Sequence, residues 1–98
     1  MNIEQKKEGN TLTIAPEGYL DTATAPELRA VLEAALDGVK ELIFDFEKLE
    51  YISSSGLRQL LFAQKAMERR GSMKVIHANE TVMEIFEVTG FSDFLTIE

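Results

Sequence analysis

The spacing of apolar residues changes repeatedly along this chain of 98 residues, and a turn signal stands at each change. Polar and apolar residues alternate over residues 11–15, which is typical of a half-buried strand. The Gly9-Asn10 pair before them predicts a turn from an earlier strand over residues 3–8. The chain is therefore expected to open with a hairpin.

Three later segments carry apolar residues at helical spacing, over residues 24–36, 54–70 and 82–89. Thr24 and Glu27 form a capping-box pattern at the start of the first segment. Glycine follows each segment, at Gly38, Gly71 and Gly90, as is common where helices end. Three helices are therefore expected.

Short apolar runs separate these helices. Residues 41–46 are almost continuously apolar, which predicts a central strand covered on both faces. Residues 73–77 predict a further strand, and residues 94–97 a possible last one. Strands that alternate with helices favour an α/β fold. We expect a single domain over residues 1–98, with a mixed sheet of four or five strands and about three helices packed against it.

The charge balance limits the possible partners. Ten Lys and Arg residues stand against seventeen Asp and Glu residues, for a formal charge of −7, which argues against binding to nucleic acid or anionic lipid. The chain has no cysteine, which excludes disulfides, thiolate metal sites and a cysteine nucleophile.

Residues 1–8 contain no apolar run, and no apolar stretch approaches the roughly 18 residues of a membrane span. We expect no direct membrane insertion and a cytoplasmic location.

Three consecutive serines, Ser53, Ser54 and Ser55, stand where a buried strand leads into the second helix. One serine could cap the helix by accepting a hydrogen bond from a backbone N–H group that has no other partner. Alternatively, the positive end of the helix dipole could accommodate a phosphate on one of these hydroxyls. The residue types alone leave both interpretations open.

Signals for catalysis are weak elsewhere. His77 is the only histidine and has no second histidine or cysteine to complete a metal site, so an exposed residue at a strand end is expected. The pattern Gly-x-Ser-x-Gly is absent, as are the glycine-rich motifs of nucleotide-binding loops. We therefore predict no catalytic residues, no metal and no cofactor, and we predict that the protein is not an enzyme.

The segment Tyr51-Ile52-Ser53-Ser54-Ser55-Gly56-Leu57 resembles the serine turn of STAS domains of the anti-sigma factor antagonist type. Residues 42–46 and the Gly18-Tyr19-Leu20-Asp21 turn extend the resemblance to essentially the whole chain. The resemblance implies a cytoplasmic bacterial regulator that acts by partner switching. In that family, a kinase that is also the anti-sigma factor phosphorylates a serine at this turn, and a PP2C-type phosphatase removes the phosphate. The unphosphorylated antagonist binds the kinase and releases the sigma factor.

Matched residue by residue, the resemblance makes Ser54 the phosphoacceptor. Ser53 replaces the aspartate common in the family, which removes an acidic determinant of kinase recognition beside the acceptor. Ser53 and Ser55 stay open as alternative acceptors. Asp21 is expected near the acceptor, unless it only bonds the backbone of its own turn. The implied partner surface comprises Asp21, Ser53, Ser54, Ser55, Gly56 and Arg58.

Two other functions stay open at this point. The chain could be a STAS module of another signalling scaffold, or of a lipid transport complex, in which the serine is not phosphorylated. It could also bind a small ligand or nucleotide through the free amides of the second helix. A hydrolytic enzyme is a more distant alternative, and the oligomeric state is left open.

Overall fold

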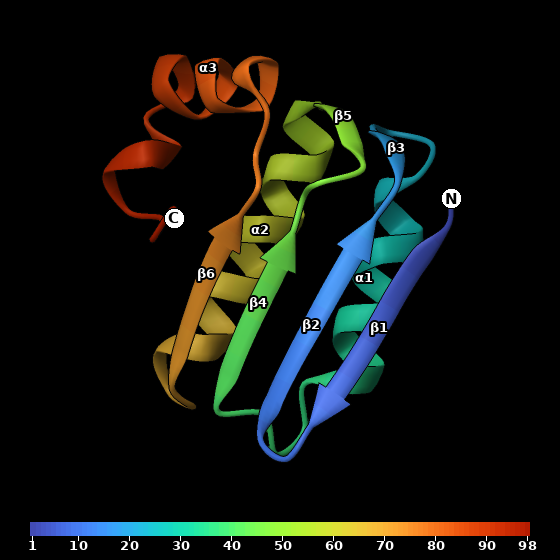
Figure 1. Cartoon of the computed structure of the whole chain (residues 1–98), viewed down its shortest axis with the longest axis vertical. Helices are drawn as coiled ribbons and strands as arrows, with labels where there is room; N and C mark the ends of the chain where they lie inside the picture. The colour runs from blue at the N-terminus through green and yellow to red at the C-terminus, as the bar shows by residue number, and fades with distance from the viewer.

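The computed structural model describes residues 1–98 and contains a four-stranded mixed sheet (Figure 1). Its strands, in spatial order, are β1 (Ile3–Glu8), β2 (Thr11–Pro16), β4 (Glu41–Asp45) and β6 (Ser72–Ile76). β1 and β2 pair antiparallel as the expected hairpin, whereas β2 pairs with β4, and β4 with β6, in parallel. The predicted mixed sheet and the central position of β4 are confirmed.

Helices α1 (Ala25–Ala35) and α2 (Ser54–Glu68) both lie behind the sheet in Figure 1, on the same face. Leu42 and Phe44 of β4 point into the buried layer, while Ile43 between them is only partly buried. The expectation that this strand is covered on both faces was therefore wrong. Both helical crossovers run over one side, and the opposite side of the sheet has no helix packed on it.

A second, two-stranded parallel sheet joins β3 (Gly18–Leu20) to β5 (Leu49–Ile52). It lies beyond the carboxyl ends of β2 and β4, next to the start of α2 (Figure 1). Gly18 enters it at φ +87°, a conformation that suits glycine, and its N–H donates to the carbonyl of Lys48 at 2.9 Å. The sequence did not predict these strands because they are three and four residues long.

Helix α3 (Glu80–Thr89) packs against β5 and is followed by a 3₁₀ turn, η1 (Phe91–Asp93). It ends as predicted at Gly90, which is left-handed. The rings of Phe46 and Phe86 lie 6.5 Å apart and join the end of β4 to α3 in the core. The possible last strand over residues 94–97 is reduced to one bridge between Val75 and Ile97.

The capping box expected at Thr24 does not form. Thr24 occupies the N-cap position of α1, but its side chain makes no cap hydrogen bond. Its hydroxyl instead donates to the carbonyl of Tyr19 at 2.8 Å and accepts from the N–H of Asp21 at 2.9 Å. The Glu27 carboxylate, the other half of the box, accepts from the amino group of Met1 at 2.9 Å. Both side chains form hydrogen bonds with partners outside the helix instead.

Candidate functional site: the turn at the start of α2

The serine turn, defined here as residues 53–56, connects β5 directly to α2. Ser53 has extended backbone angles, and its hydroxyl accepts from the N–H of Gly56 at 3.4 Å. Its own N–H donates to the carbonyl of Leu20 on β3 at 2.8 Å. Ser53 is therefore the helix cap, and its side chain serves the fold.

The other two serines differ from Ser53 and from each other. Ser54 is the first residue of α2, its side chain is exposed, and its hydroxyl makes no hydrogen bond to another residue. Ser55 is partly buried, and its hydroxyl oxygen lies 3.1 Å from that of Thr22 in the loop before α1. Among the three hydroxyls, only that of Ser54 is both exposed and without a hydrogen-bond partner.

Gly56 is buried beneath the turn. A Cβ atom at this position would lie 2.7 Å from Cγ1 of Ile52 and 2.8 Å from Cγ of Leu20. It would also lie 3.0 Å from the backbone carbonyl of Leu20. Glycine therefore allows the first turn of α2 to approach β3 and β5 closely, so Gly56 shapes this surface from below.

Asp21 lies in the loop that joins β3 to α1. One oxygen of its carboxylate accepts from the N–H groups of Ala23 at 3.0 Å and Thr24 at 3.1 Å. This is the local turn bonding that the sequence left open as an alternative. The loop is nevertheless tied to the serine turn, because Leu20 and Thr22 on either side of Asp21 bond Ser53 and Ser55.

Two exposed tyrosines stand beside the turn. Tyr19 and Tyr51 are direct partners in the β3–β5 ribbon, their ring centroids are 6.0 Å apart, and they are 56% and 39% exposed. Sequence reasoning missed this pair. Its signal was present in the alternation of each tyrosine with an apolar neighbour, Leu20 or Ile52, because alternate residues of a strand point to opposite faces.

A groove of about 320 Å³ runs between the starts of α1 and α2. Thr22 and Ser55 line it together with Arg29 and Arg58, the latter an exposed residue that forms no ion pair. The N-terminus of α2 adds the positive end of a helix dipole. Arg58 and the helix N-terminus thus bring positive charge to the serine turn of a protein whose formal charge is −7.

His77 lies away from the serine turn, in an exposed position at the end of β6, as expected. Its Nδ1 lies 2.9 Å from Oδ1 of Asp45, and this hydrogen bond, with the charges of Asp45 and Glu47, raises the pKa of His77. One ligand atom from each of these three side chains lies within 4.8 Å of the others. They are the one group in the chain with the spacing of metal ligands, although exposed carboxylates commonly cluster without an ion.

No helix of the structure combines the length and the apolar character that a membrane crossing requires.

The family model described as "STAS domain" matches residues 2–98. BtrV of Bordetella bronchiseptica, a candidate anti-sigma factor antagonist, is 32% identical over 93 residues, which cover 93% of this chain and 80% of that protein. The anti-sigma-B factor antagonist of Staphylococcus aureus is 26% identical over 99 residues, which cover 99% of this chain and 92% of the relative.

Solved structures match the fold. The anti-sigma factor antagonist SpoIIAA in its unphosphorylated form superposes with a TM-score of 0.83 at 23% identity, over 99% of this chain and 88% of that chain. The phosphorylated form of SpoIIAA, from Bacillus, superposes with a TM-score of 0.77 at 22% identity, over 99% and 91%.

Proposed function

This chain belongs to the STAS domain family, and we propose that it is an anti-sigma factor antagonist controlled by phosphorylation of Ser54. In its unphosphorylated form it binds an anti-sigma factor that is also a serine kinase. Phosphorylation by that kinase ends the binding, and a PP2C-type phosphatase restores it. The names of BtrV and of the Staphylococcus aureus relative support this assignment. So does SpoIIAA, whose solved structures include an unphosphorylated and a phosphorylated form.

The observation that carries the proposal is the exposed and unbonded hydroxyl of Ser54. A kinase must bring the acceptor oxygen into its own active site, which is easiest for a side chain that makes no contact with its own protein. The hydroxyl of Ser53 caps the helix and that of Ser55 is paired with Thr22. Both would have to break a contact first, so Ser54 is the favoured acceptor.

A phosphate on Ser54 would change the surface without unfolding the domain. It adds a charge of about −1.5 to −2 at the N-terminus of α2, where the helix dipole favours an anion. The fold therefore tolerates the modification. A bound partner would meet new bulk and new negative charge in the contact, and a loss of roughly 2.7 kcal/mol would weaken binding about 100-fold.

The partner surface surrounds Ser54. In the proposal, Tyr19, Tyr51 and Arg58 make direct contacts, since tyrosine and arginine are enriched among residues that dominate binding energy. Asp21, Ser53, Ser55 and Gly56 hold the surface in shape through the hydrogen bonds and the close packing described above. The protein acts as a binding module and as a kinase substrate, and not as an enzyme.

Mass spectrometry tests the phosphosite. The protein is incubated with the anti-sigma factor kinase of its own organism and ATP, and the modified peptide is fragmented. We expect one phosphate on Ser54 in the wild type, none in Ser54→Ala, and an unchanged level in the matched variants Ser53→Ala and Ser55→Ala. Undiminished modification of Ser54→Ala would assign the phosphate to another residue.

Calorimetric titration with the same partner tests the switch. Ser54→Asp should bind about 100-fold more weakly than wild type, whereas the neutral control Ser54→Asn keeps most of the affinity. Equal binding by Ser54→Asp and wild type would favour a STAS module of another signalling scaffold or of a lipid transport complex. Saturable binding of ATP or GTP by the protein alone would favour the nucleotide-binding alternative.

A further inference from the structure

Positive charge is concentrated on α2 and the turn after it. Residues 53–71 contain four cationic side chains and one carboxylate, whereas the rest of the chain contains six cationic side chains and sixteen carboxylates. The four cations are Arg58, Lys65, Arg69 and Arg70. An acidic protein thus carries one basic segment, made of α2 and the turn after it.

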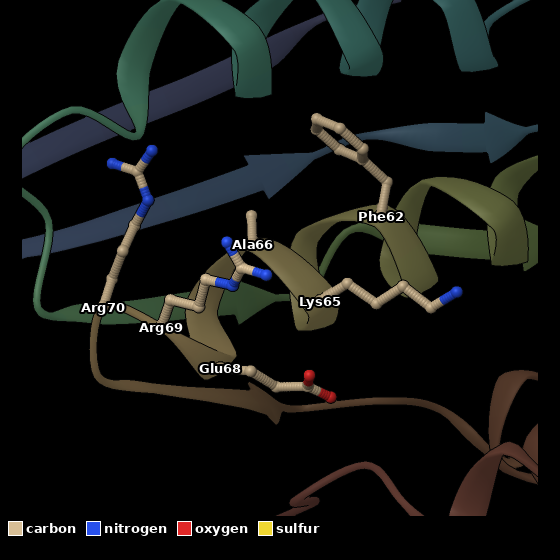
Figure 2. Close-up of a pocket in the computed structure, with 6 residues that line it drawn as sticks. All are labelled: Phe62, Lys65, Ala66, Glu68, Arg69 and Arg70. Carbon is tan, nitrogen blue, oxygen red and sulfur yellow. The ribbon is translucent and has the colours of Figure 1, made fainter.

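Most of these cations border a groove at the C-terminal half of α2, which we call the basic groove (Figure 2). Its volume is about 710 Å³. Phe62 and Ala66 supply its apolar side chains, and Lys65, Arg69 and Arg70 its positive charge. Glu68 is the one carboxylate among the residues that line the groove. Figure 2 shows the Phe62 ring and the Arg70 guanidinium extending toward α1, while Glu68 extends to the other side.

The arginine nearest to α1 is held in place. Nη1 of Arg70 donates to the carbonyl of Leu36, at the end of α1, at 2.8 Å and lies 3.7 Å from a carboxylate oxygen of Asp37. On the other side, the guanidinium of Arg29 lies 3.6 Å from the centre of the Phe62 ring. The groove therefore has fixed walls, formed by side chains that connect α1 to α2.

Lys65 and Arg69, in contrast, are exposed and form no ion pair. With Phe62 they repeat at intervals of three and four residues, which places them on one face of the helix. Two unpaired cations beside an aromatic ring can bind carboxylates by charge-assisted hydrogen bonds and pack apolar side chains between them. No group of this chain uses that capacity.

The shape of the groove indicates the class of ligand. The groove is an open one, lined by six residues that come only from α2 and the turn after it, whereas sites for small molecules enclose most of the ligand. Asp37, in the loop after α1, pairs with Arg70, so a carboxylate stands at the α1 side of the cationic strip. A nucleic acid requires a broader basic face, and here it would meet a surrounding surface of negative charge.

We propose that the basic groove binds an acidic segment of a partner protein. The proposal is separate from the function assigned to Ser54, because the 15 residues of α2 span about 22 Å and the groove lies at the opposite end of the helix from that serine. A partner bound there would stay bound whether or not Ser54 carries a phosphate.

Fluorescence anisotropy with a labelled decaglutamate peptide tests the proposal on the full chain. We expect saturable binding that weakens as salt is added. The variant Lys65→Glu/Arg69→Glu should lose roughly tenfold or more in affinity, because two attractive contacts become repulsive. The matched control is Lys7→Glu/Lys48→Glu, which makes the same change in net charge at two unpaired lysines elsewhere. It should lose less than about twofold.

Three outcomes would overturn the proposal. Equal loss of affinity in both double variants would mean that net charge, and not the groove, attracts the peptide. Loss of peptide binding in Ser54→Asp would place the peptide at the serine turn. Tighter binding of a labelled decathymidylate than of the peptide would assign the groove to nucleic acid. Circular dichroism of each variant checks folding, which exposed charge changes should leave intact.

Discussion

The hydroxyl oxygens of Thr22 and Ser55 lie 3.1 Å apart and join the loop before α1 to the first turn of α2. This contact directs the Ser55 side chain into the groove between the two helices, while Ser54 faces solvent. A charge added to Ser55 would break the contact and crowd the groove. A charge added to Ser54 would disturb no internal contact, so two neighbouring serines differ in what their modification does to the fold.

Replacement of Ser54 by aspartate is expected to stabilise the protein. A negative charge in the first turn of a helix interacts favourably with the dipole, and the gain is about 0.3–1 kcal/mol in the free energy of unfolding. Urea denaturation of Ser54→Asp and of the neutral control Ser54→Asn measures the difference. If Ser54→Asp binds the partner more weakly and is at least as stable as wild type, the added charge acts on binding and does not destabilise the fold. A lower stability of the aspartate variant than of the asparagine variant would contradict the prediction.

Replacement of Gly56 by alanine is expected to destabilise the protein. The added methyl group would overlap with Leu20 and Ile52, which are fully buried in the core. Overpacking of this kind costs about 1–3 kcal/mol. Chemical denaturation measures the loss in the free energy of unfolding. The control is Ser55→Ala, one residue earlier, which should change this free energy by at most about 1 kcal/mol. If Gly56→Ala is as stable as wild type, the side chains of β3 and β5 can shift without cost.

Replacement of Tyr51 by alanine should weaken binding of the anti-sigma factor by roughly tenfold or more, because exposed aromatic side chains at the centre of an interface carry much of its energy. The variant should remain folded, since Tyr51 is an exposed residue outside the buried core and its ring pairs with that of Tyr19, which is also exposed. Isothermal titration calorimetry measures the affinity. Val88→Ala is the control, because Val88 is 77% exposed on α3. Equal effects of both substitutions would exclude the tyrosine pair from the interface.

The ion pair between His77 and Asp45 is expected to make stability depend on pH. The hydrogen bond to Asp45 raises the pKa of His77 in the folded state above the value of 6.5 in the unfolded chain. A raised pKa means that the folded state binds the proton more tightly. The stabilising contribution is therefore complete below pH 6.5, and it disappears as the pH rises through the folded-state pKa.

An NMR titration of the His77 ring protons checks this expectation. The midpoint should lie above 6.5 in the wild type and should fall in Asp45→Asn, which removes the negative charge but keeps the size of the side chain. Glu47→Gln should lower the midpoint less, because Glu47 contributes only through its charge. A midpoint that does not change in Asp45→Asn would mean that the pair is not formed in solution.

The sequence predicted those parts of the fold that have long periodic signals. The β1–β2 hairpin, the strands β4 and β6 and the three helices have five or more residues each, enough for an apolar pattern to be recognised. β3 and β5 are too short for such a signal. The capping box at Thr24 failed because its hydroxyl found partners in the preceding turn, at Tyr19 and Asp21. Such competition is decided by the path of the backbone and not by residue type.

For the candidate site, the sequence indicated a position in the fold but not the contacts of each residue. The run of serines and its resemblance to STAS domains indicated the start of the second helix, and the family is now shown by the match over residues 2–98. The sequence could not separate the roles of the three serines, because the partner of Ser55 is Thr22, 33 residues earlier in the chain. The Tyr19–Tyr51 pair was missed for the same reason, since it depends on two short strands being neighbours.

The covering of the sheet by α1 and α2 on one face has a consequence for how such a chain can evolve. Along β2, β4 and β6, every second side chain is locked into the core, and the intervening ones, such as Thr13, Ile43 and Lys74, have no helix above them. Amino-acid exchange at these intervening positions should be tolerated far more often than at their neighbours. Substitutions should then accumulate at every second position of these strands. Two proteins could differ at half of the residues of each strand and still keep the same backbone and the same serine turn.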